Sequence, residues 1–168
     1  MFKNFISEVI FNLLSVQKIR DWIRKKIYPY NQFKKDIIVD TRSSHPIRFT
    51  LNKEIPTVDI WLTVISKCQY LDAMFDTAIL LSLDVHNNGL RHILSQKHIM
   101  PRKTIYKKCE VEVFCSFELN EKQIEILKQI DKTSSISANL SLEYHIDSSL
   151  YSFSNEITLY GRPCEIWK

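Results

Sequence analysis

The sequence predicts a mainly β protein, in which an N-terminal amphipathic helix precedes an antiparallel, immunoglobulin-like β-sandwich with one short inserted helix. Apolar residues recur every three or four positions through residues 1–27, which is typical of one face of a helix. From Lys34 onward the apolar residues alternate with polar ones, as in half-buried strands, without the rhythm of strands and long helices that a parallel sheet requires. Just after Asn120 the helical period returns for about two turns.

Length and composition indicate an ordinary globular chain. The 168 residues are 45% hydrophobic and 25% charged, which suits one domain with room for an appendage. The formal charge of +4 permits an anionic partner without requiring one. Only two glycines occur, and no glycine-rich motif is present, which disfavours a phosphate-cradling loop.

Residues 1–30 are predicted to form an amphipathic helix that docks on a membrane or on a partner. The first half of this helix is apolar nearly all round, and its second half is rich in Lys and Arg. Pro29 ends it, because the residue before a proline is disfavoured in the helical conformation. The uncharged run over 9–17 is too short to span a bilayer. The predicted docking residues are Phe2, Phe5, Ile6, Val9, Leu13, Val16, Lys18, Arg20, Trp22, Ile23, Arg24, Lys25 and Lys26.

The partner expected for this helix follows from its charge and its apolar stripe. Such a helix lies in a membrane interface, where each basic residue near anionic lipid contributes about 1 kcal/mol. The alternatives are that the stripe packs on the body of its own chain, or that it is buried in a protein interface. The expected partners are therefore an anionic membrane surface, a protein, or further copies of this chain in a homo-oligomer. The location expected is cytoplasmic, peripheral on the membrane.

Residues 31–168 are predicted to form the β-sandwich. The segments with strand periodicity are DIIVD, IRFTL, TVDIWLTVIS, DTAILLSLDV, LRHILSQKHI, CEVEVFCSFEL, SISANLSLEYHID and LYSFSNEITLYGRPCEIW. In the fourth segment the alternation puts Ile79, Leu81, Leu83 and Val85 on one face. Asn88-Gly89, which follows it, predicts a hairpin turn.

The stretch CEVEVFCSFELNEKQIEILKQI passes from a strand directly into a helix. The strand parity predicts that Cys109 and Cys115 face inward with their apolar neighbours. Asn120 has the residue type of an N-cap, and Gln123 stands at the reciprocal position of a capping box. We expect this short helix to cover one open end of the sandwich.

The order of these strands resembles the late-embryogenesis-abundant type 2 family, also called the water-stress and hypersensitive-response (WHy) domain, over about 57–167. The residues that carry the resemblance are VDIWLTVIS, AILLSLDVHNNG, HIMPRKT, IYKKCEVEVFCSFEL and ISANLSLEYHI. Lys67-Cys68-Gln69 stands where that family commonly has Asn-Pro. The resemblance implies a non-enzymatic β-sandwich, often tethered to a membrane, and it supplies no catalytic residues.

The residues themselves predict no catalytic, cofactor or metal site, and we expect the protein not to be an enzyme. The four cysteines form no CxxC pair, and we expect reduced thiols, although a disulfide involving Cys68 or Cys164 stays open. The spacing of His86, His92 and His98 matches no common zinc motif. Nucleic-acid binding is the less favoured interpretation: stacking needs exposed aromatic residues, and Trp61, Phe114 and Tyr160 have outward parity, but a second sheet can equally cover them.

Overall fold

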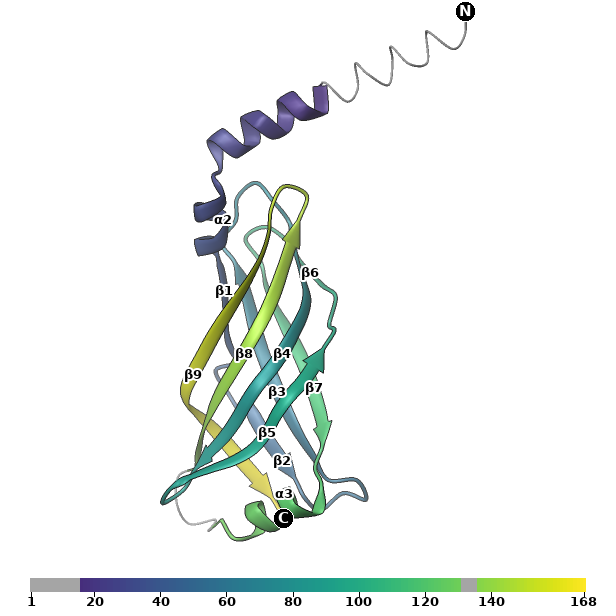
Figure 1. Cartoon of the computed structure of the whole chain (residues 1–168), viewed down its shortest axis with the longest axis vertical. Coiled ribbons are helices and arrows are strands. Elements are labelled where there is room, and N and C mark those ends of the chain that lie inside the picture. Colours follow the sequence, from purple (N-terminus) through teal and green to yellow (C-terminus); the bar gives the residue numbers. More distant parts are fainter. Residues whose placement is uncertain (1–15, 131–135) are drawn as a thin grey trace, which may run out of the picture.

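A computed structural model describes residues 16–130 and 136–168 and confirms the prediction of a mainly β protein (Figure 1). A helix over 16–27 comes first among these residues, followed by α2 (Tyr30–Asp36). The strands of the body are β1 (Ile37–Thr41), β2 (Ile47–Thr50), β3 (Thr57–Ser66), β4 (Ala73–His86), β5 (Leu90–Ile99), β6 (Lys103–Ile105), β7 (Glu110–Glu118), β8 (Ser137–Ser148) and β9 (Ser152–Trp167). One helix, α3 (Glu121–Lys128), is inserted between β7 and β8.

The strands form two groups that share β9. In the first group, β3 pairs with β7 along one edge and with β1 and β2 along the other. In the second, β4 pairs with β8 along one edge and with β5 and β6 along the other. Alternate side chains of both groups point inward to one apolar core, whose largest fully buried members include Phe33, Phe49, Phe75 and Leu127.

Strand β9 joins the two groups, and it makes the sheet mixed rather than wholly antiparallel. Its residues up to Pro163 pair antiparallel with β8. Its last part, Cys164–Trp167, pairs parallel with Ile47–Thr50 of β2. All the other strand pairs of the described chain are antiparallel, as predicted.

The predicted inward face of β4 is wrong in its central part. Ala78 and Leu80 are buried there, whereas Ile79 and Leu81 are only partly covered. The register of β4 against β8 shifts twice, between Phe75 and Thr77 and between Leu80 and Ser82. Each such β-bulge inserts one residue and transfers the following side chains to the opposite face.

The passage from β7 into α3 agrees with the sequence except at its first residue. Cys109 is exposed, contrary to the prediction, because it lies in the turn before β7 rather than in the strand; Cys115 is buried, as predicted. The Asn120 side chain accepts a hydrogen bond from the Gln123 backbone N–H, and the Gln123 side chain accepts one from the Asn120 N–H. The predicted capping box is therefore confirmed.

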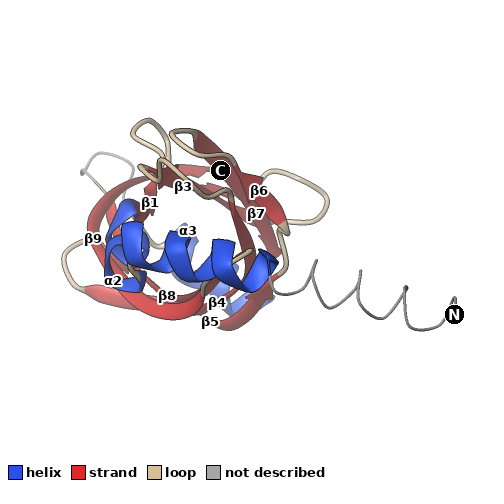
Figure 2. Cartoon of the chain, turned by 90° about the horizontal axis from the view of Figure 1, so that it is seen from above, coloured by secondary structure: helices blue, strands red, loops and turns tan. Residues whose placement is uncertain are grey.

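The body has two ends, and different elements cover them. In Figure 1, α3 lies at the lower end, and the helix over 16–27 rises from the upper end. Figure 2 looks down on the upper end and shows that helix crossing over it, with the strands arranged around it. We call these the helix end and the α3 end. At the helix end lie the loops between β3 and β4, between β6 and β7, and between β8 and β9.

Candidate functional site

The helix over 16–27 presents an apolar face that the described body does not cover. Every residue of this helix except Asp21 is exposed. Val16, Ile19, Ile23 and Ile27 follow one another at spacings of three or four, so they share one face, and they are 44–63% exposed. Of the predicted docking residues, Phe2, Phe5, Ile6, Val9 and Leu13 lie outside the described residues, and Val16, Lys18, Arg20, Trp22, Ile23, Arg24, Lys25 and Lys26 all lie on this helix.

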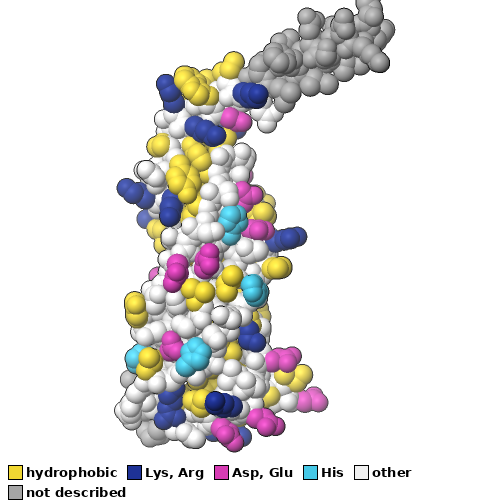
Figure 3. Space-filling model, viewed as in Figure 1, with side chains coloured by type: hydrophobic (Ala, Val, Ile, Leu, Met, Phe, Trp, Pro, Cys, Tyr) yellow, Lys and Arg dark blue, Asp and Glu magenta, His cyan; other side chains and the backbone are white. Residues whose placement is uncertain are grey.

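Basic residues flank this apolar face on both sides. At about 100° per residue, Arg20 and Arg24 border one side of the face and Lys26 borders the other, whereas Lys18 and Lys25 lie on the opposite side of the helix. Trp22 is 58% exposed, and the Lys26 ammonium lies 4.3 Å from the centroid of its ring. Figure 3 shows yellow and dark blue side chains together at the helix end, and both dark blue and magenta side chains at the α3 end. No helix in the described part of the chain is long and apolar enough to cross a membrane.

Tyr28 fixes the base of this helix to the body. The helix ends at Ile27, as the position of Pro29 predicted, and Tyr28 is 5% exposed. The Tyr28 hydroxyl donates a hydrogen bond to the Asp36 carboxylate and lies 3.1 Å from the Cys68 sulfur. Its main-chain carbonyl accepts a hydrogen bond of 2.7 Å from the Tyr151 hydroxyl. One residue is thereby bonded to α2, to the β8–β9 loop and, through Cys68, to the β3–β4 loop.

Burial and these hydrogen bonds keep the Tyr28 hydroxyl protonated. Burial is the largest cause of the raised pKa of Tyr28, and the Asp36 carboxylate and the Cys68 thiol raise it further. A neutral hydroxyl is the form that donates to the Asp36 carboxylate. The ring of Tyr28 also meets Phe33 and Tyr70 edge-on, with centroid distances of 6.4 and 5.6 Å. The attachment therefore combines aromatic packing with a satisfied polar network.

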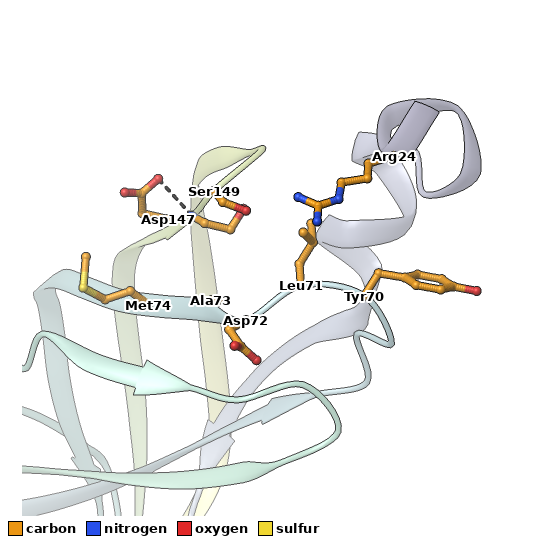
Figure 4. A pocket seen from close by; sticks show the side chains of 9 residues that line it. Arg24, Tyr70, Leu71, Asp72, Ala73, Met74, Asp147 and Ser149 are labelled. Atoms are coloured by element: carbon orange, nitrogen blue, oxygen red, sulfur yellow. Dashed lines mark hydrogen bonds between the residues drawn. The ribbon is translucent and has the colours of Figure 1, made fainter. Parts of the chain in front are cut away.

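Two adjoining clefts lie where the helix meets the body. The larger, of about 460 Å³, is lined by Arg24 together with Asp72, Met74 and Asp147. The smaller, of about 210 Å³, is mostly apolar and is lined by Arg24, Ile27, Tyr28, Tyr70, Leu71 and Leu150. Figure 4 shows Arg24 reaching from the helix above Leu71, while Tyr70 points away from the body. The Arg24 guanidinium makes no ion pair with the described residues.

Three of the four cysteines are buried, and four of the five histidines have side-chain hydrogen-bond partners. Burial raises the pKa of the Cys115 thiol to about 12, and burial followed by the nearby Glu165 raises that of Cys164 to about 12. Thiols with such pKa values are not nucleophiles at neutral pH. All four cysteines are free. Within the described ranges no three His, Cys, Asp or Glu side chains are grouped to hold a metal ion.

The buried thiols of Cys115 and Cys164 predict that the free energy of unfolding falls at alkaline pH. Their pKa values are raised in the folded chain, so the unfolded chain releases protons first as the pH rises through about 9, and folding becomes less favourable. Between pH 8 and pH 10 each thiol should remove about 1.4 kcal/mol from the free energy of unfolding. Urea unfolding at the two pH values should show a smaller loss for Cys115→Ala/Cys164→Ala than for the wild type. Equal losses in both proteins would show that Cys115 and Cys164 do not cause the loss of stability.

Sequence reasoning identified the helix but not its attachment. Tyr28, Tyr70, Leu71 and Leu150 were absent from the predicted docking residues, although they line the junction. The sequence Tyr28-Pro29-Tyr30 was the available signal, because a large aromatic residue beside a proline that ends a helix is well placed to pack on the body. The residues from the two loops carry no periodic pattern and are brought together only by the fold.

No protein-family model matches this sequence, and no curated protein matches it. Among solved structures, the chain is similar to the crystal structure of Spo0M, a sporulation control protein from Bacillus subtilis, with 12% identity and a TM-score of 0.39. The similarity covers 77% of this chain, which spans about half (49%) of the Spo0M chain.

Proposed function

We propose that this protein is a non-catalytic binding or scaffold domain that is held on an anionic membrane surface by its N-terminal helix. The observation that carries the proposal is the uncovered apolar face of residues 16–27, bordered by basic side chains. In the same proposal the body is an immunoglobulin-like sandwich of the late-embryogenesis-abundant type 2 kind, and the protein is cytoplasmic and peripheral on the membrane. The two strand groups joined by β9, with α3 over one end, support the sandwich interpretation.

The charge of the helix favours lipid headgroups over an apolar groove of a protein. Residues 16–27 contain five basic residues and a single acidic one, Asp21. With each basic residue worth about 1 kcal/mol near anionic lipid, the basic side chains supply several kcal/mol of attraction. The apolar face adds the burial of isoleucine side chains, about 1.5–3 kcal/mol for each that is fully covered. Trp22 has the amphipathic ring that is enriched at membrane interfaces.

The proposal is tested with two full-length variants and liposome co-sedimentation. Ile19→Gln/Ile23→Gln removes apolar surface without changing charge, and we expect it to leave most of the protein in the supernatant. Arg20→Gln/Lys26→Gln keeps the apolar face, and we expect weaker binding to vesicles with phosphatidylserine and little change on phosphatidylcholine alone. Asn52→Gln, an exposed change in the loop before β3, is the matched control and should bind as the wild type does.

The outcomes separate a membrane from a protein partner. Wild-type protein that stays in the supernatant with every vesicle composition would rule out the membrane role. Light scattering of the same samples then tests the protein interface: a wild-type oligomer that Ile19→Gln/Ile23→Gln converts to a monomer would assign the apolar face to self-association.

A further inference from the structure

We infer that the β3–β4 loop and the β6–β7 loop at the helix end form a second surface for anionic lipid headgroups, separate from the helix. This loop surface consists of Lys67, Tyr70, Tyr106, Lys107 and Lys108. The inference rests on the proposed membrane role and adds a part of the body to it. It predicts that the helix end of the body contacts the lipid. The alternative is a body that is attached only through the helix and makes no lipid contact of its own.

Two hydrogen bonds from the β6–β7 loop hold it to the β3–β4 loop, and a third bond ties the β3–β4 loop to Asp36. The Lys108 N–H donates to the Cys68 carbonyl at 3.1 Å, and the Lys67 N–H donates to the Asp36 carbonyl at 2.8 Å. The Lys107 N–H donates to the Asp72 carboxylate at 2.9 Å. The loop surface is therefore a fixed part of the body, and its lysines come from the same end as the helix.

The lysines of the loop surface have free charges. Lys67, Lys107 and Lys108 are all exposed, and their ammonium groups have no hydrogen bond or ion pair with any described residue. The nearby carboxylates of Asp36, Asp72 and Asp147 accept hydrogen bonds from neutral donors and remain charged, but none of them forms an ion pair with these lysines. The lysine ammonium groups are therefore available to an anionic partner.

Two tyrosines give the loop surface the aromatic part of a membrane interface. Tyr70 is 59% exposed and Tyr106 is 62% exposed, and each has an apolar ring with a polar tip. The Tyr70 ring also touches Tyr28, the residue that fixes the base of the helix. The loop surface therefore adjoins the residue that attaches the helix to the body.

The conformation of Lys108 gives a further reason to assign a role to this loop. Lys108 has φ 56°, in the left-handed region where Gly and Asn are the favoured residues. The turn is closed by a hydrogen bond of 3.1 Å from the Cys109 N–H to the Tyr106 carbonyl. A lysine at this position lowers stability and places a charge at the tip of the turn.

The test compares two full-length triple variants that lose the same charge from opposite ends. Lys67→Gln/Lys107→Gln/Lys108→Gln removes the lysines of the loop surface. Lys53→Gln/Lys122→Gln/Lys128→Gln removes three exposed lysines from the α3 end and is the matched control. On phosphatidylcholine vesicles that contain phosphatidylserine, the first variant should partition roughly a hundredfold less than the wild type, at about fivefold for each lysine. The control should match the wild type, and rising salt should reduce the difference.

Lys108→Asn supplies a test that loss of folding cannot explain. Asparagine tolerates the left-handed conformation, so the midpoint of thermal unfolding should not fall, while vesicle partitioning should fall about fivefold. Wild-type protein that does not bind vesicles would overturn both this inference and the proposed function. Wild-type binding together with equal partitioning of the loop-surface variants would overturn this inference alone.

Discussion

Replacing Phe33 with alanine is expected to lower the free energy of unfolding by about 3–5 kcal/mol. Phe33 is the buried residue of α2, and none of its side chain is exposed. Its ring packs against Tyr28, Tyr151 and Phe153, with centroid distances of 6.4, 5.6 and 5.8 Å. Alanine leaves a cavity that these rings cannot fill without leaving their own contacts, so the loss lies well above that of a surface substitution.

The matched control for this prediction is Tyr30→Ala in the same helix. Tyr30 is 41% exposed and touches Tyr151 from the solvent side, with ring centroids 5.7 Å apart. We expect it to lose about 1 kcal/mol or less, because its ring is only partly removed from water. Urea unfolding of both variants makes the comparison. Similar losses for Phe33→Ala and Tyr30→Ala would show that α2 is not part of the core.

Replacing Tyr28 with alanine is expected to lower the free energy of unfolding about as much as Phe33→Ala does. It should also weaken the attachment of the helix to the body. The substitution removes a ring that is 5% exposed together with the hydroxyl that donates to Asp36. Tyr28→Phe separates the two effects, since it keeps the ring. We expect Tyr28→Phe to lose about 1–3 kcal/mol, because a partly buried carboxylate then lacks one donor and keeps only the Gln32 side chain. Tyr28→Ala should lose about 3–5 kcal/mol.

Amide hydrogen exchange distinguishes attachment from general stability. In Tyr28→Ala the amides of residues 28–33 should exchange faster than those of β3 and β8, because the contacts that hold this corner are gone. In Tyr28→Phe the aromatic contacts persist, and exchange at this corner should change less. Uniform acceleration throughout the body in Tyr28→Ala would contradict a local anchoring role.

Much of the fold follows from local patterns in the sequence. The boundaries of β3 and β5 coincide with the segments TVDIWLTVIS and LRHILSQKHI, because alternation and the flanking turn residues mark both ends. In β8 the apolar residues that alternate with polar ones, Ala138, Leu140, Leu142, Tyr144 and Ile146, are all buried. The start of α3 was predictable because a capping box involves only residues three positions apart.

The differences arise where structure depends on distant contacts. Helix α2 has seven residues, and the burial of Phe33 rather than a repeating stripe stabilises it. Strand β6 has three residues, too few to show alternation, and pairs with the start of β4. The bulges in β4 and the parallel pairing of β2 with β9 have no local sequence signal.

The candidate site also has one part that follows from local sequence patterns and one part that depends on distant contacts. Helical spacing alone selects the apolar face of residues 16–27, and proline chemistry gives its end. The loop surface is different, because Lys67 and Lys108 are far apart in sequence. They lie near each other since the Lys108 N–H donates a hydrogen bond to the carbonyl of Cys68, the residue after Lys67. Only the pairing of β3 with β7 brings the two loops to one end.

The crossing of β9 between the strand groups has a consequence for biosynthesis. Strand β2 comes from the first third of the chain, yet its parallel neighbour is the final stretch of β9. During translation β2 therefore stays unpaired on that edge until β9 has emerged from the ribosome. The helix over 16–27 precedes β2 in the chain, so it emerges earlier than the strand that joins the two strand groups of the body.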